Sequence, residues 1–349
     1  MLPGLLMLSG CREVFYPEIE AAGPLVVVEG RITNEEGPYI VRLSETSGYG
    51  SGEFGTPLEN AQVWVREVEG ESFWFTEVAP GEYRSPPGMT GKPEKTYVLE
   101  FETPDGLVYQ SAPQFMHPPH EQNGLLARES LRTETRLSNS GQLIITEIDG
   151  LDASLQLREQ PGNRANIRFT SDVKILYTYD AGGFFDPTRY FCWKKIWRLE
   201  GVDNINLPTT STKPGDVSNN VVAFLPHDRR RLYIEPLVEQ IHTIAIRVRA
   251  YSLNEDAYTY YLEVNKQLTS DGSIFAPIPS QLTSNIFCVT EPRRAAVGLF
   301  EVSSVASQAY ILRQPPNVEA ALFEPTDKYE GVPRAPGCSV NEPPPFWFN

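Results

Sequence analysis

The sequence lacks several features that define common protein classes. It has four cysteines, four histidines and four methionines in 349 residues. Beyond Leu8 no apolar run reaches the roughly 18–20 residues that a membrane-spanning helix needs. Basic residues are also scarce, with 30 Lys and Arg against 45 Asp and Glu and a net charge of −15. Because nucleic-acid binding relies on an excess of cationic side chains, this balance argues against a nucleic-acid partner.

Proline, glycine and aromatic residues are, by contrast, plentiful. The 30 prolines and 26 glycines predict many turns and few long helices. The length of the chain predicts two domains. Acidic charge is concentrated in residues 1–120, which hold 18 Asp and Glu against 7 Lys and Arg, a net of −11.

The chain starts with a short apolar stretch, Leu2–Leu8, followed by Ser9, Gly10 and Cys11. The pattern Leu-Ser-Gly-Cys is typical of a bacterial lipobox, in which the cysteine is acylated and becomes the mature N-terminus. Residues 1–11 are therefore expected to be a truncated lipoprotein signal, since no Lys or Arg precedes the apolar stretch. Two or three acyl chains on Cys11 would hold the protein to a membrane, with residues 12–23 as a tether. The alternative is an ordinary buried cysteine.

Residues 24–118 contain short β-branched or alternating segments separated by turn residues. Examples are LVVVEGRIT, YIVRLSET, AQVWVREV and KTYVLEFET. Six or seven such segments at intervals of about ten residues predict an Ig-like β-sandwich. The following MHPPHEQNG predicts a polar hinge between domains. Its His117 and His120 are either hinge residues or metal ligands, and the absence of adjacent Asp or Cys favours the hinge.

Residues 125–335 predict a larger β-rich domain with one helix at 253–269. The strands are rich in Ile, Val, Tyr and Trp. The helix is predicted from Ser252 and Glu255, which form a capping box, and from apolar residues that recur at helical spacing. Tyr258, Tyr260 and Tyr261 in this helix are interpreted as packing residues, with sugar stacking as the alternative.

The cysteines beyond Cys11 are Cys192, Cys288 and Cys338. Their odd number allows at most one disulfide, and an exported protein can keep one. Cys288–Cys338 is the favoured pair, because Cys338 lies in a proline-rich tail, residues 336–349, that a crosslink would stabilise most.

Two proline- and aromatic-rich segments are candidates for a partner interface, because aromatic residues bury a large area at small entropic cost. Each residue has internal packing as its alternative. The candidates are Phe275, Pro277, Pro279, Trp347 and Phe348.

As a set, the lipobox, LVVVEGRITNEEGPYIVRLSET and SLNEDAYTYYLEVNKQLTSDGSIFAPIPSQLTSNI resemble an uncharacterised family of Bacteroidota outer-membrane lipoproteins, a DUF4249-like domain of unknown function. The resemblance implies a carboxypeptidase-regulatory-like or transthyretin-like first domain. It also implies a gene beside a TonB-dependent receptor. Members often carry two closely spaced cysteines near the C-terminus, whereas this chain has only Cys338 there.

The expected function is therefore that of a non-enzymatic, lipid-anchored outer-membrane protein. It would be an accessory or ligand-binding partner of a TonB-dependent receptor barrel and need no cofactor. The alternatives are a structural or adhesive surface lipoprotein and, less favoured, a hydrolase acting on glycans. The four histidines are not part of a nucleophile elbow or an H-E-x-x-H motif, although paired carboxylates need no motif.

Overall fold

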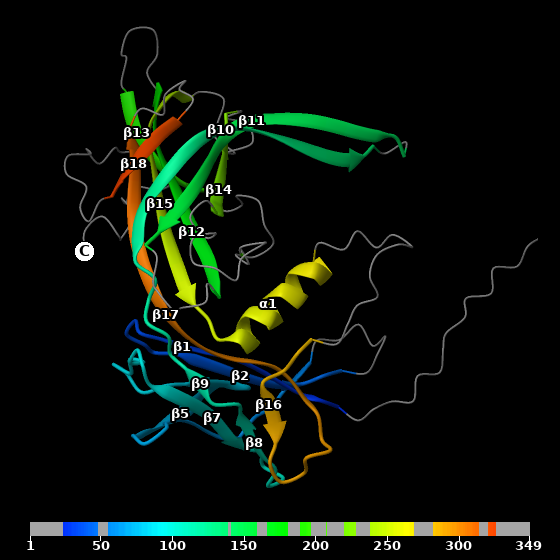
Figure 1. The fold of residues 1–349 in the computed structure, drawn as a ribbon. Helices are drawn as coiled ribbons and strands as arrows, with labels where there is room; N and C mark the ends of the chain where they lie inside the picture. Colours follow the sequence, from blue (N-terminus) through cyan, green and yellow to red (C-terminus); the bar gives the residue numbers. More distant parts are fainter. Residues whose placement is uncertain are drawn as a thin grey trace, which may run out of the picture.

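A computed structural model of the chain describes residues 24–47, 55–138, 141–158, 166–180, 189–196, 207, 220–227, 238–268, 282–313 and 320–325. Over these residues the protein is mainly β, with eighteen strands and one α-helix, as the alternating pattern predicts. The strands form two β-modules that follow one another along a long shared strand (Figure 1). The described part of the chain contains no helix with the length and hydropathy that crossing a membrane would require.

The first module consists of two facing sheets. One has the order β17–β1–β2–β6–β5 with β3 beside β2, and the other has the order β16–β8–β7–β4–β5 with β9 beside β7. Its strands are β1 (Val26–Thr33), β2 (Ile40–Glu45), β3 (Thr56–Pro57), β4 (Gln62–Glu67), β5 (Ser72–Ala79), β6 (Glu82–Arg84), β7 (Thr96–Glu102), β8 (Val108–Ser111), β9 (Gln114–Phe115), β16 (Ile286–Cys288) and the first half of β17 (Ala296–Arg313). Alternate residues such as Val26, Val28 and Ile32 point into one core.

The second module also has two sheets, with the orders β18–β10–β11–β14 and β13–β12–β15–β17. Its strands are β10 (Gln122–Leu137), β11 (Leu143–Leu157), β12 (Ile167–Asp180), β13 (Arg189–Ile196), β14 (Asn220–Pro226), β15 (Val238–Ser252), β18 (Ala320–Pro325) and the second half of β17. β18 pairs with both β10 and β17 and so connects the two sheets. A separate core of Leu, Ile, Val and Phe side chains lies between them.

Strand β17 belongs to both modules. Residues 296–303 pair in parallel with β1, and residues 304–313 pair antiparallel with β15. At Gly298, with φ of +115°, a Cβ atom would lie 1.9 Å from the carbonyl oxygen of Val28, so only glycine fits beside β1. The sequence places everything from 125 to 335 in the second domain, whereas the structure places β16 and half of β17 in the first module.

The helix α1 (Glu255–Leu268) lies between the modules and matches the predicted helix at 253–269 closely (Figure 1). Its start differs from the predicted capping box. The helix begins one residue after Asn254, whose carbonyl accepts from the Tyr258 amide at 3.0 Å and whose side-chain amide donates to the Val302 carbonyl at 3.2 Å. Ser252 is instead the last residue of β15.

Truncating Phe300 to alanine should destabilise the protein strongly, because its ring is fully buried on β17 against the first core. A Phe→Ala change in a packed core costs about 3–5 kcal/mol. Urea denaturation of Phe300→Ala measures this cost. The matched control is Phe287→Ala on β16, where the ring is 47% exposed and the expected loss is below about 1 kcal/mol. If the two variants lost equal amounts of stability, the first half of β17 would not be part of the first core.

Candidate functional site

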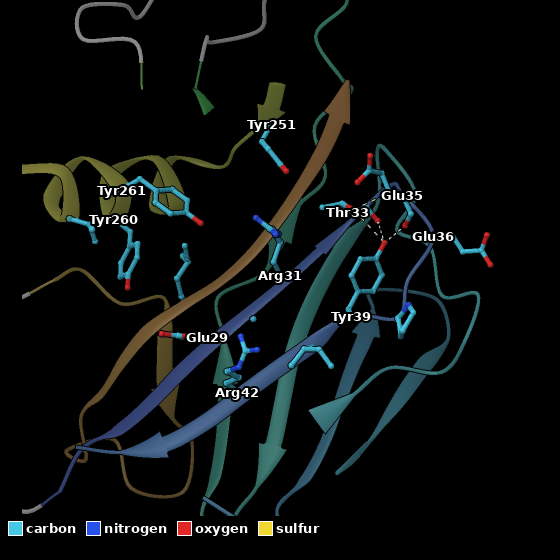
Figure 2. Close-up of a pocket in the computed structure, with 15 residues that line it drawn as sticks. Glu29, Arg31, Thr33, Glu35, Glu36, Tyr39, Arg42, Tyr251, Tyr260 and Tyr261 are labelled. Atoms are coloured by element: carbon cyan, nitrogen blue, oxygen red, sulfur yellow. Dashed lines mark hydrogen bonds between the residues drawn. The ribbon is translucent and has the colours of Figure 1, made fainter. Parts of the chain in front are cut away.

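A groove of about 610 Å³ lies between helix α1 and the outer face of strands β1 and β2 (Figure 2). Its volume is in the range of small-molecule sites. Its lining residues come from three parts of the chain: Glu29, Gly30, Arg31, Thr33, Glu35, Glu36, Pro38, Tyr39, Ile40, Arg42, Tyr251, Tyr260, Tyr261, Val264 and Leu299. The groove therefore depends on both modules.

Strand alternation places the charged groups of the floor. Val28 and Ile32 point into the core, so Glu29 and Arg31 point outward beneath α1. Figure 2 shows Arg31 extending from β1 toward Tyr251 and Tyr261. Its guanidinium carbon lies 5.4 Å from the centre of the Tyr251 ring, a cation–π contact.

The turn after β1 forms one end of the groove. The Tyr39 hydroxyl donates to the carbonyl oxygen of Thr33 at 2.6 Å and also contacts the carbonyl oxygen of Glu35. The Thr33 hydroxyl accepts from the Glu35 amide at 3.2 Å. These bonds fix the turn, so the exposed carboxylates of Glu35 and Glu36 stand at the rim.

Behind the groove lies a buried ion pair between the modules. Arg168 of β12 and Glu301 of β17 are 4% and 1% exposed, with a guanidinium nitrogen 3.4 Å from a carboxylate oxygen. Glu301 also accepts from the Tyr261 hydroxyl at 2.5 Å and the Ser303 hydroxyl at 2.6 Å. The guanidinium of Arg168 lies 4.1 Å from the centre of the Tyr251 ring and 4.8 Å from that of Tyr261.

The surroundings of this pair keep both groups charged. Burial acts to raise the pKa of Glu301, but Arg168, Arg31 and the two hydroxyl donors outweigh it and hold that pKa below its usual value. Burial acts to lower the pKa of Arg168, but Glu301 together with Tyr261 and Tyr251 raises that pKa above its usual value. Burial and the neighbouring Glu301 raise the pKa of Tyr261, which therefore stays a hydrogen-bond donor.

Comparison with protein families gives one match. The family described as a domain of unknown function (DUF4249) matches residues 12–309. The chain belongs to this family. No curated protein and no solved structure matches it. The DUF4249 match includes every residue that lines the groove and both partners of the buried ion pair.

Most interface and modification residues predicted from the sequence lie outside the described part of this DUF4249 chain. They are Cys11, Phe275, Pro277, Pro279, Cys338, Trp347 and Phe348. Cys288 is described and is a free, buried cysteine in the first core, with its sulfur 3.3 Å from the Glu291 amide nitrogen. Cys338, its predicted partner, lies outside the described residues, so the pairing stays a prediction.

The two histidines of the predicted hinge are part of the junction between the modules. His120 is 2% exposed, with Nδ1 2.8 Å from the Ser252 hydroxyl and Nε2 without a hydrogen-bond partner among the described residues. His117 packs edge-on against Phe115 at 5.1 Å, and its carbonyl accepts from the Ser304 hydroxyl. Among the described residues no three His, Cys, Asp or Glu are grouped to hold a metal ion.

The tyrosines of α1 pack as the sequence suggests. Tyr258, Tyr260 and Tyr261 are partly buried against a small apolar cluster at the junction. The Tyr260 and Tyr261 rings meet edge-on, with centres 5.7 Å apart. Stacking on a sugar needs two open ring faces on one surface, and these contacts do not provide them.

The sequence reasoning missed the charged residues of this site. Each is a charged residue with an apolar residue on both sides, Arg168 in IRF and Glu301 in FEV. A single charge in such a run signals a buried, paired group, because an unpaired one would cost too much. Glu29 and Arg31 give a weaker signal, since outward charges on a strand are common.

Replacing Glu301 with glutamine should lower the free energy of unfolding by about 3–5 kcal/mol, because Arg168 would remain buried without its counter-ion. Urea denaturation at neutral pH checks this. The control is Glu82→Gln, which removes the exposed Arg42–Glu82 pair and should cost less than about 1 kcal/mol. A loss for Glu301→Gln as small as the control's would contradict the structural role of the buried pair.

His120 should make the stability of the protein depend on pH. Burial, followed by the charge of His117, lowers its pKa from 6.5 to about 4 in the folded state. Between pH 4 and 6.5 this histidine binds more protons in the unfolded chain than in the folded protein. The stability that neutral His120 contributes is therefore complete above pH 6.5 and is lost as pH falls toward 4. We expect His120→Asn to reduce the loss of stability between pH 7 and 4.5 by up to about 3 kcal/mol. Identical pH dependence in variant and wild type would refute this.

Proposed function

We propose that this DUF4249 protein is a non-enzymatic outer-membrane lipoprotein, anchored through Cys11, that serves as an accessory or ligand-binding partner of a TonB-dependent transporter. The observation that carries the proposal is the groove between α1 and the β1–β2 face. It has the size of a ligand site, and its polar groups converge from both modules. The lipobox at Leu8–Cys11 and the family resemblance support the anchor and the transporter.

Binding without catalysis is supported by the chemistry of the groove. Its carboxylates Glu29, Glu35 and Glu36 are exposed. Glu301, the buried carboxylate nearby, is held ionised by Arg168 and two hydroxyl donors, which does not suit it to give or take a proton. A glycan hydrolase would need one carboxylic acid with a raised pKa beside an ionised one.

A structural or adhesive surface lipoprotein is the second candidate, favoured by a separate observation. The ends of β10 and β11 extend beyond their neighbours as a two-stranded arm (Figure 1). Leu131, Leu143 and Ile145 on this arm are 58–63% exposed. Exposed aliphatic side chains on one face of a projecting ribbon are suited to contact with another surface.

The transporter proposal is tested by affinity purification of the tagged protein from detergent-solubilised outer membrane of its native host. We expect a TonB-dependent receptor to be recovered in near-stoichiometric amount. Cys11→Ala removes the only acylation site of the lipobox and should shift the protein out of the membrane fraction. It should also reduce recovery of the receptor, because two or three acyl chains give stable membrane attachment.

Two results would count against this function. Mass spectrometry that finds Cys11 without lipid on the membrane-associated protein would remove the anchor. Recovery of the lipoprotein alone, in a detergent that keeps receptor complexes intact, would favour the structural or adhesive role.

A further inference from the structure

Glu29 and Arg31 are charged groups of the groove that the fold leaves available. Both are exposed residues on the same face of β1. Neither forms an ion pair with the other or with any further residue that the structure describes, whereas Arg42 pairs with Glu82 at 2.8 Å and Glu35 lies 3.9 Å from Arg249. Arg31 does contact the Tyr251 ring, and its charge acts on Glu301 at longer range. An acid and a base that face one cavity without an ion-pair partner are suited to bind a ligand carrying both charges.

The spacing of Glu29 and Arg31 along the β1 backbone indicates the length of such a ligand. Residues two apart on a strand lie about 7 Å apart, because each residue advances the strand by roughly 3.3 Å. An extended peptide of two or three residues separates its terminal ammonium and carboxylate by about 7–11 Å. We propose that the groove binds a short zwitterionic peptide, with its C-terminal carboxylate on Arg31 and its N-terminal ammonium toward Glu29. This inference rests on the proposed ligand-binding function and names its ligand class.

Arg31 is held in a suitable position for a carboxylate. Its guanidinium carbon lies 5.4 Å from the centre of the Tyr251 ring, and its N–H groups make no hydrogen bond to a residue that the structure describes. A planar guanidinium binds a carboxylate through two parallel hydrogen bonds. Figure 2 shows Arg31 in the middle of the groove, between the α1 tyrosines and the turn that carries Glu35 and Glu36.

The charges around the groove disfavour other ligands. Three carboxylates and two guanidiniums line it, so a polyanion would meet repulsion at the rim. Tyr251 is 6% exposed and lies 4.1 Å from the Arg168 guanidinium, and the Tyr261 ring also contacts Arg168. These rings therefore offer little open face to a sugar. Ile40, Val264 and Leu299 supply apolar contacts for small peptide side chains.

Isothermal titration calorimetry with four probes tests the proposal on the full mature chain. The probes are trialanine, trialanine amide, N-acetyl-trialanine and maltotriose. We expect trialanine to bind, and amidation or acetylation to weaken binding about 10-fold or more, as expected for loss of one charge-assisted interaction. Maltotriose should not bind.

Variants assign the two ends of the peptide. In the Arg31→Gln variant, trialanine and trialanine amide should bind equally weakly. In the Glu29→Gln variant, trialanine and N-acetyl-trialanine should bind equally weakly. Arg84→Gln is the matched control, because Arg84 is an exposed strand residue of the same module outside the groove. Thermal unfolding of each variant confirms an intact fold, as expected for changes at exposed positions.

The outcomes separate this inference from the proposed function. Equal affinity for the three peptides, or no binding of any peptide, overturns the inference. If the affinity purification still recovered the receptor, the transporter role would remain supported. Binding of maltotriose alone would also overturn it and identify a sugar site. Trialanine binding that depends on Arg31 without any recovered receptor would support the peptide site and reject the transporter role.

Discussion

The whole arrangement depends on the pairing of β17 with two strands from different modules. Its first half pairs with β1 and its second half with β15, and pairing changes between Ser303 and Ser304. Because both halves belong to one extended strand, the modules cannot rotate freely about the linker at residues 117–121. The backbone hydrogen bonds of β17 would have to break first. This shared strand holds α1, which follows β15, above the β1–β2 face.

The buried ion pair lies beside this change of partner and reinforces it. Moving Arg168 and Glu301 out of water costs several kcal/mol per ion, which the attraction offsets only when further hydrogen bonds are made. Those bonds come from Tyr261 on α1 and Ser303 on β17. The cluster therefore joins β12, β17 and α1, and any other placement of these elements would leave a buried charge unsatisfied. Its contribution is to the choice of arrangement more than to overall stability.

Local sequence pattern predicted the elements well but not the long-range pairing. Alternating residues in YIVRLSET predicted β2, and helical spacing from Ala257 predicted α1, since both patterns reflect which side of an element is buried. The parallel pairing of β1 with β17 was missed, because strands so distant in sequence share no local signal. The groove was missed for the same reason, since its walls meet only after β17 has joined the modules. The five proline and aromatic residues proposed for a partner interface all lie outside the described part of the chain.

The way the groove is built links ligand binding to the placement of the modules. Its floor, with Glu29 and Arg31, belongs to the first module, whereas Tyr260 and Val264 belong to the helix that continues from β15. A ligand that touches both walls binds only the arrangement in which α1 covers β1, so its binding energy adds to the stability of that arrangement. The reverse also holds, because β17 and the buried ion pair form the groove before a ligand arrives. Little binding energy is then spent on ordering the site, and a small ligand with few contacts can be recognised by its charges.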